Sequence, residues 1–481
     1  MNRALPQDAA SGETEGEKTG PADQSWLKPG WVEGWDPEDE EFWERRGKKI
    51  AWKNLLISIP ALHFAFLVWL LWSAIVVNMN SVGFEFTVGE LFWLTAIPGL
   101  TGPTLRIVHS FLPSILGGRV THIISIGSLL IPMVWLFFAI QNVDTSWATF
   151  MMIGALAGFG GGNFASSMSN ISSFFPRRQQ GLALGLNAGL GNLGVSTVQL
   201  VTPLIIGVGI VGGAVVYREG KFIDGEWITT AGGVVKDVWL QSGLLIWIVP
   251  IVIVLIAATL FMNSLKSFSL PLKEQMEIFK LRNTWTMTWL YTMAFGSFIG
   301  YSAAFPLTIK LVYGGLDDAP DGLALQFAFL GPLVGSLIRP IGGWLSDKYT
   351  GAKVTLAAGI GLIISSLSVT AFTHPTSMDS FPYFLAIFLA MFFFTGLLNG
   401  STFRMIGVIK QFNFRTRGPA LGWTSAVAAY GAFIIPIVFK GAIERTGAPD
   451  QGLYGFVVFY AVSMVILWWF YLRKSSPEYG A

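Results

Sequence analysis

The chain contains no cysteine, which excludes disulfide bonds, thiol catalysis and metal sites built on thiolates. Its four histidines, His63, His109, His122 and His374, show no common metal-ligand spacing, so we expect no metal, haem or other cofactor. Charged residues are scarce, at 12% of 481 residues against about 25% in ordinary soluble proteins. No acidic residue lies deep in an apolar segment and paired carboxylates are missing, so we do not expect an enzyme.

Apolar residues make up 52% of the chain and aromatic residues 14%. A soluble fold of this length cannot bury so much apolar surface, so the composition indicates an all-α polytopic membrane protein. The residues near position 10 are polar, so we expect no cleavable signal peptide. Twelve apolar segments reach the roughly 20 residues that a membrane-spanning helix needs. They are residues 54–78, 87–108, 121–141, 147–175, 179–209, 238–262, 284–310, 322–345, 353–373, 381–409, 416–440 and 453–472.

Lysine and arginine residues are concentrated in alternate connections between these segments. Because cytoplasmic loops of membrane proteins are enriched in positive charge, both termini are predicted to be cytoplasmic. The longest connection on that side divides the segments into six and six. We therefore expect a cytoplasmic tail (1–53), a first six-helix half (54–262), a cytoplasmic linker (263–283), a second six-helix half (284–473) and a second tail (474–481).

The N-terminal tail is polar, and its first thirty residues have the composition of a disordered segment. A short helix is predicted between Trp35 and Glu44, with Asp36 as its N-cap and Pro37 in its first turn. Trp43 beside several basic residues favours a position on the membrane surface. A helix surrounded by solvent fits the same pattern, and the sequence leaves both interpretations open.

Two arginines stand inside apolar, glycine-rich and proline-rich segments. Arg106 and Arg339 are 233 residues apart, and each is followed twelve residues later by a glycine, Gly118 or Gly351. An arginine in the bilayer interior costs about 2.5–3.5 kcal/mol, so it persists only where it faces a partner or a cavity. A single arginine of this kind commonly bonds backbone carbonyls or reaches a helix end. Two in matching register favour a binding site for a planar anion, because guanidinium offers a fixed fork of donors.

Small residues recur every three or four positions in the fifth segment, and Asn192 lies among them. Such faces let membrane helices approach closely, either to slide past each other or to pack permanently. We expect a gating role for the glycines of the fifth segment and for two in the eleventh, namely Gly181, Gly185, Gly189, Gly191, Gly194, Gly422 and Gly431.

The two halves resemble each other beyond the arginines, as in the pairs GLALG (181–185) with GPALG (418–422) and Asn163 with Asn399. The run from Gly343 to Gly351, GWLSDKYTG, resembles the loop motif GxLaDrxG of the major facilitator superfamily. The resemblance implies twelve transmembrane helices in two pseudo-symmetric six-helix halves. Ser114 stands where the first half would carry the acidic residue of that motif, so a charge latch is expected on one side only.

Several longer motifs, TGPTLRIVHSF, GFGGGNFASSMSNISSFFP, GLALGLNAGLGNLGVS and FGSFIGYSAAFP, are similar to those of the nitrate/nitrite porter (NarK-like) family, over nearly the whole chain. The resemblance implies transport of nitrate and nitrite across a prokaryotic cytoplasmic membrane, by a protein that works as a monomer and binds no nucleic acid. It implies that Arg106 and Arg339 clamp the anion. It further implies that Asn192 and Tyr291 form hydrogen bonds to the anion and that the aromatic walls are Phe66, Phe164 and Phe295.

The sequence departs from the family in two places. The family carries a first nitrate signature in span five, here Gly181–Leu193, and a second in span eleven, here Gly422–Phe433. The second signature of this chain has alanines and Tyr430 where many members have glycine. Arg404 adds a charge to the tenth segment, either as a third contact for the anion or as a side chain that reaches the cytoplasmic helix end.

The family includes both exchangers and proton-coupled importers, and the spans contain no deep carboxylate to carry a proton. We therefore expect nitrate/nitrite antiport. Proton symport is the alternative, with His109 and His63 as the residues able to titrate. A carrier for another small anion, a channel and a membrane enzyme or sensor are the remaining interpretations.

Overall fold

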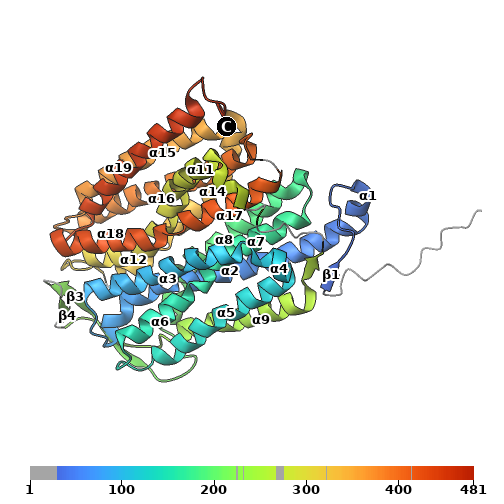
Figure 1. Ribbon diagram of the computed structural model, residues 1–481. Coiled ribbons are helices and arrows are strands. Elements are labelled where there is room, and N and C mark those ends of the chain that lie inside the picture. Colours follow the sequence, from blue (N-terminus) through green and yellow to red (C-terminus); the bar gives the residue numbers. More distant parts are fainter. Residues whose placement is uncertain are drawn as a thin grey trace, which may run out of the picture.

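The computed structural model describes residues 30–223, 226–230, 232–266, 273, 276–320, 322–412 and 414–481. The expectation of disorder for the first thirty residues therefore lies outside the described residues, except for Gly30. Figure 1 shows an elongated bundle of helices, and in the described part of the chain strands occur only as three short pairs. The prediction of an all-α polytopic fold is confirmed.

The first half of the chain supplies the first six spans. They are α2 (Lys48–Met79), α3 (Val88–His109), α5 (Gly118–Ala139), α6 with α7 (Trp147–Ala157 and Phe159–Phe174), α8 (Arg177–Ile205) and α9 (Ser242–Phe261). A short helix, α4 (Leu112–Leu116), joins α3 to α5. The fourth span is broken at Gly158, where a Cβ atom would lie 1.9 Å from the hydroxyl of Thr101, so only glycine lets α3 pass this closely.

The second half supplies the other six spans. They are α11 with α12 (Arg282–Tyr291 and Ser297–Val312), α13 with α14 (Leu323–Phe327 and Leu330–Tyr349), α15 (Gly351–Val369), α16 (Phe381–Val408), α17 with α18 (Phe414–Ala428 and Gly431–Thr446) and α19 (Asp450–Leu467). A π-helical turn, Thr292–Gly296, joins α11 to α12. Each of the twelve predicted segments thus coincides with one helix or with one interrupted helix.

Ten of the described helices are long and apolar enough to cross a membrane. The other two predicted spans are α3 and the interrupted pair α6–α7. The hydropathy of α3 is lowered by the polar side chains that it carries, among them Arg106 and His109. The fourth span falls short in length instead, because the interruption at Gly158 divides it into helices of 11 and 16 residues.

The N-terminal helix differs from the prediction. It starts at Glu40 rather than near Trp35, because the N-cap is Asp39, whose carboxylate accepts from the backbone N–H groups of Glu41 and Phe42. From there α1 (Glu40–Phe42) runs through a π-helical turn directly into α2, and Trp43 is fully buried. The segment is therefore the first part of the helix that forms span one.

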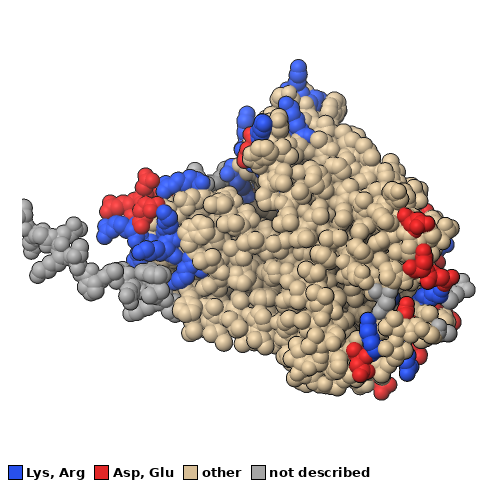
Figure 2. Space-filling view, turned by 180° about the vertical axis from the view of Figure 1, so that it is seen from behind, with Lys and Arg blue, Asp and Glu red and all other residues tan. Residues whose placement is uncertain are grey.

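Charged residues gather at the two ends of the bundle. In Figure 2, lysine and arginine residues crowd the end near the N-terminal helix, acids and bases are mixed at the opposite end, and a broad uncharged belt separates them on this face. We call the first the basic end and the second the far end. The surface is indented between the two halves at the basic end (Figure 2).

A long hairpin at the far end was not predicted. Strands β2 (Val215–Arg218) and β5 (Val235–Val238) pair antiparallel, and β3 (Gly220–Ile223) and β4 (Glu226–Thr229) continue the ladder toward the tip. At the basic end, β1 (Gly30–Val32) pairs in parallel with β6 (Asn263–Leu265), which ties the N-terminal segment to the start of the linker.

The two halves of the chain meet along α3 and α18, and along α2 and α12. At the first contact the backbones touch, since a Cβ atom on Gly99 would lie 2.3 Å from the carbonyl carbon of Ala432. Deeper in, Gln199 of α8 donates hydrogen bonds to the hydroxyl of Ser73 and to the carbonyl of Ser302 in the other half. The hairpin adds an ion pair between Lys221 and Asp317 of 2.7 Å.

Candidate functional site

The two arginines predicted from the sequence meet at one aromatic ring. Arg106 extends from α3 and Arg339 from α14, and their guanidinium carbons lie 5.5 and 5.3 Å from the ring centroid of Phe295. Arg106 has no exposed surface. Within the described residues, neither arginine forms an ion pair with an acidic side chain. The region therefore carries two positive charges that the protein leaves uncompensated.

Arg106 is held by backbone carbonyls from both halves of the chain. Its Nε donates to the carbonyl of Gly161 on α7 at 2.8 Å, and its Nη1 donates to the carbonyl of Ser425 on α17 at 3.0 Å. The third nitrogen, Nη2, is buried and has no hydrogen-bond partner within the described part of the chain. A buried guanidinium N–H without a partner is costly, so this nitrogen is suited to bind an anionic ligand.

Arg339 is held by side chains of its own half. Its Nη2 donates to Oδ1 of Asn399 on α16 at 2.7 Å. Tyr291 also interacts electrostatically with this guanidinium. Its Nε is buried and, among the described residues, has no partner. Each arginine thus keeps one buried donor free beside the ring that they share.

Aromatic side chains surround the two guanidinium groups. Phe164 lies beneath Arg106, 4.8 Å from the ring centroid to the guanidinium carbon, and is stacked with Phe295 across the two halves at 6.3 Å. Phe66 contacts Phe164 edge-on, so the three predicted wall residues do come together. The sequence analysis missed Trp69, below Arg106 at 5.3 Å, and Phe298, below Arg339 at 5.2 Å. Each lies one helical turn after a predicted wall residue.

Asn192 is buried on α8 and has no hydrogen bond to either arginine. Its Nδ2 donates to the carbonyl of Ala188 on the same helix, and its Oδ1 has no partner in the described residues. Gly191 and Gly194 on either side pack against α2, where a Cβ on Gly194 would lie 2.0 Å from the carbonyl oxygen of His63. Asn192 is therefore placed close to the helix that carries Phe66.

The seven glycines predicted to have a gating role fall into two groups of three, with Gly422 between them. Gly191, Gly194 and Gly431 allow close helix contact, and a Cβ on Gly431 would lie 2.1 Å from the carbonyl oxygen of Gly296 in the π-helical turn. For Gly181, Gly185 and Gly189, in contrast, no atom of the described residues outside the backbone of the same helix lies within 4 Å of the Cβ position. Gly422 is intermediate, with Ser110 of the other half at 3.4 Å. Close packing thus explains the first group but leaves the three glycines nearest the basic end unexplained.

Three of the four histidines, His63, His109 and His122, are held by groups of the first half. His109 is buried and its Nδ1 lies 3.4 Å from the hydroxyl of Ser125 on α5, while His63 bonds the carbonyl of Leu190 on α8. His122, which the sequence analysis did not assign a role, contacts Ser58 at 3.2 Å. These three rings are thus held by groups of the first half.

Arg404 does not belong to the anion site. Its Nε forms an ion pair with Asp347, the acidic residue of the loop motif at the end of α14. Of the two alternatives left open by the sequence, the structure supports the one in which Arg404 reaches the helix end. The side chain of Ser114, in the matching place of the first half, lies outside the described part.

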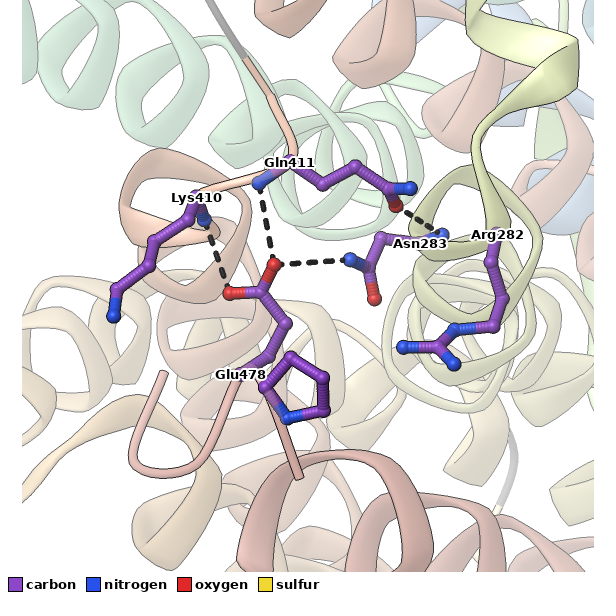
Figure 3. Close-up of a pocket in the computed structure, with 6 residues that line it drawn as sticks. Arg282, Asn283, Lys410, Gln411 and Glu478 are labelled. Carbon is purple, nitrogen blue, oxygen red and sulfur yellow. Dashed lines mark hydrogen bonds between the residues drawn. The ribbon is translucent and has the colours of Figure 1, made fainter. Parts of the chain in front are cut away.

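A cavity of about 540 Å³ opens at the basic end, away from the two arginines, and is lined by Arg282, Asn283, Lys410, Gln411, Pro477 and Glu478. The Glu478 carboxylate is turned into it (Figure 3) and accepts hydrogen bonds from the backbone N–H groups of Lys410 and Gln411 and from the Asn283 amide. Glu478 is only 7% exposed. The C-terminal segment thus ties the end of α16 to the start of α11.

Comparison with known proteins agrees with this architecture. Residues 61–436 match the family model of the Major Facilitator Superfamily. The chain is 43% identical, over 94% of its length and 99% of the relative, to a Thermus thermophilus protein named probable nitrate/nitrite antiporter NarK2. It is 39% identical, over 92% and 96%, to the nitrate/nitrite transporter NarU of Escherichia coli (strain K12). It is 23% identical, over 89% and 97%, to a nitrite extrusion protein of Bacillus subtilis (strain 168).

Proposed function

This chain belongs to the NarK-like nitrate/nitrite porters of the Major Facilitator Superfamily, and from that premise we propose that it exchanges nitrate for nitrite across the cytoplasmic membrane. The observation that carries the proposal is the pair Arg106, which is buried, and Arg339, which is partly buried. Both lie beside one phenylalanine ring, each has one buried donor without a partner in the described residues, and no described carboxylate pairs with either. Planar, weakly hydrated monovalent oxyanions match both the donor fork and the aromatic walls.

We further propose that transport occurs by alternating access and that this structure faces the cytoplasm. The halves are joined on the far-end side of Arg106 and Arg339 by the contact of Gly99 with Ala432 and by Gln199 with Ser302. At the basic end the surface is indented between them (Figure 2). There, no described residue outside the backbone of α8 comes within 4 Å of the Cβ position of Gly185. In the opposite state, the far end would open and the glycine face of α8 would gain a partner.

Exchange follows from the charge of the site. With the anion absent, two cations would face each other without compensation in a region of low dielectric constant, which opposes closure around an empty site. Either monovalent anion reduces the net charge of the site from two to one, which lowers the cost of closure, so the loaded protein reorients more readily than the empty one. We also propose that both termini are cytoplasmic, which is supported by the lysines and arginines at the basic end. The chain then divides into the segments 1–53, 54–262, 263–283, 284–473 and 474–481. We propose the monomer as the working unit.

Uptake of labelled nitrate into proteoliposomes tests the proposal under three conditions: empty vesicles, vesicles loaded with nitrite, and empty vesicles with an inward proton gradient. We expect uptake only with internal nitrite. Uptake driven by the proton gradient alone would establish symport instead and would make His109 and His63 the first residues to substitute. Uptake that is neither saturable nor stimulated by internal nitrite would indicate a channel. If the vesicles took up a labelled carboxylate strongly but took up no nitrate, the protein would be a carrier for another anion.

A further inference from the structure

The two arginines are supported in different ways. Arg106 is held by carbonyl groups on α7 and α17, one from each half of the chain. Arg339 is held within the second half, where its Nη2 donates to Oδ1 of Asn399 at 2.7 Å. A relative movement of the halves therefore changes the hydrogen bonds of Arg106 but can leave those of Arg339 intact.

The orientation of the Asn399 amide is fixed by its other contacts. Its Nδ2 donates to the carbonyl of Thr395 at 2.8 Å and approaches the carbonyl of Ala294 at 3.4 Å. Since the amide nitrogen faces two carbonyls, the amide oxygen must face Arg339. Ala294 precedes Phe295, so Asn399 connects the arginine to the turn that carries its aromatic partner. Asn399 is 2% exposed, so these bonds are shielded from water.

The backbone around Asn399 leaves little freedom. A Cβ atom on the next residue, Gly400, would lie 2.2 Å from the carbonyl oxygen of Arg339, and one on Gly396 would lie 2.5 Å from the carbonyl oxygen of Gly335. Helices α14 and α16 therefore touch backbone to backbone on both sides of the contact. The donor and the acceptor of the Arg339–Asn399 bond are thus carried on a rigid pair of helices.

The matching residue of the first half does not act in this way. Asn163 of α7 accepts a hydrogen bond from Ser166 on its own helix, and its Nδ2 has no partner in the described residues. Arg106 instead uses the carbonyl of Gly161. The support of an arginine by an asparagine is therefore specific to the second half and does not follow from the duplication.

We propose that Asn399 is a positioning residue that fixes the Arg339 guanidinium plane, so that Arg339 is the stationary anchor of the anion while Arg106 is the mobile contact. The inference rests on the proposed anion site and specifies how that site selects a planar ligand. A fixed fork of donors favours a planar oxyanion, whereas a spherical anion of the same charge gains little from the orientation.

Isothermal titration of the purified protein with sodium nitrate, and then with sodium bromide at constant ionic strength, tests the inference. We expect Asn399→Ala to weaken nitrate binding on the order of tenfold and bromide binding much less, because a charge-assisted contact loses its alignment. Asn399→Asp should abolish the binding of both anions, since a carboxylate would neutralise Arg339. The control is Asn54→Ala, because Asn54 is also buried and also donates to the carbonyl four residues earlier, at 2.8 Å, but lies at the basic end.

Equal losses for nitrate and bromide in Asn399→Ala, or no loss, would overturn the inference. A second measurement separates it from the proposed function, because it needs no ligand: the rate at which phenylglyoxal modifies Arg339, followed by mass spectrometry. We expect Asn399→Ala to raise this rate several-fold and Asn54→Ala to leave it unchanged. An unchanged rate in Asn399→Ala would contradict the positioning role, whereas failure of the wild-type protein to bind nitrate would contradict the proposed function alone.

Discussion

The hydroxyl of Thr104 on α3 lies 2.8 Å from the hydroxyl of Tyr430, between α17 and α18 of the other half. Tyr430 is one of the residues, together with several alanines, by which the segment Gly422–Phe433 departs from the resembled family, and Thr104 is two positions before Arg106. The departure therefore adds a hydrogen bond between the halves directly beside the candidate site.

Replacing Tyr430 with phenylalanine should weaken this conformation. A hydrogen bond of this kind contributes about 0.5–1.5 kcal/mol, so the equilibrium should shift roughly twofold to tenfold toward the opposite state. Ser302→Cys provides the reporter, since Ser302 is fully buried between the halves and the chain has no other cysteine. We expect an impermeant maleimide to label the thiol of the Ser302→Cys variant faster in the Tyr430→Phe background. An unchanged rate would show that the bond does not hold the halves together.

Replacing either site arginine with lysine should severely impair nitrate transport. An ammonium group keeps the charge but cannot form the planar fork, and the loss of a bond to a charged group costs about 1.5–3 kcal/mol, or at least tenfold in affinity. Uptake by Arg106→Lys and Arg339→Lys proteoliposomes measures the effect. Arg45→Lys is the matched control, because Arg45 is exposed and pairs with Glu41. Near-normal uptake in a site variant would remove that residue from the clamp.

Cross-linking the hairpin to the second half should stop transport. Lys221 in β3 pairs with Asp317 beyond α12 at 2.7 Å, and this contact must separate if the far end opens. We expect a short thiol cross-linker to inactivate Lys221→Cys/Asp317→Cys, and cleavage of the linker to restore uptake. In the control pair, Val216→Cys/Asp237→Cys, both residues lie within the hairpin and are directly paired. Full activity of the cross-linked test pair would mean that the hairpin does not take part in opening.

The same ion pair predicts a limited dependence on pH. The hydrogen bond and the charge of Lys221 lower the pKa of Asp317 below its ordinary value. A lowered pKa means that the pair contributes fully above the ordinary pKa of aspartate, about 3.9, and is lost as the pH falls through the lowered value. Maleimide modifies the thiolate, so labelling of the Ser302→Cys variant is compared at each pH with labelling of the unfolded chain. We expect this ratio to be constant from pH 8 to about pH 5 and to rise modestly in more acid buffer, because exposed pairs contribute little. Asp317→Asn should remove the acid-dependent rise.

Removing the carboxylate of Glu478 should destabilise the protein without changing the anion site. Glu478→Ala leaves the N–H groups of Lys410 and Gln411 and the Asn283 amide without their acceptor in a largely buried place, at a cost of about 1–3 kcal/mol. Thermal unfolding in detergent measures the loss, and Asp144→Asn in an exposed loop is the control. Unchanged unfolding with reduced nitrate affinity would assign Glu478 to binding instead.

The sequence predicted the parts of this molecule that depend on local pattern. The lengths of the spans, and the matching positions of Arg106 and Arg339 in the two halves, can be read directly from the sequence. The structure places both arginines beside Phe295. Trp69 and Phe298 were missed because an aromatic residue one turn from another is usual in any apolar helix. The contact of Asn399 with Arg339 was also not predicted. The sequence shows that Asn399 corresponds to Asn163, but it does not show which of the two side chains reaches an arginine.

Two further differences arise from contacts distant in sequence. The hairpin around β3 and β4 was not predicted, because the residues of its paired strands show no strong alternation of polar and apolar side chains. The N-terminal helix was predicted to begin near Asp36, since Asp36-Pro37 is a good start signal. Asp39 caps it instead, and the aromatic rings of Trp35 and Phe42 pack against each other at 5.3 Å ahead of span one.

The hairpin also determines how this protein can be imaged. In single-particle electron microscopy, a 52.5 kDa membrane protein that lies mostly inside a detergent belt has few features outside the belt by which its images can be aligned. Strands β2 to β5 form a folded projection at the far end (Figure 1), next to Asp317 of the other half. An antibody fragment raised against that composite surface would recognise residues of both halves, and would therefore add mass to one conformation and select it from the population.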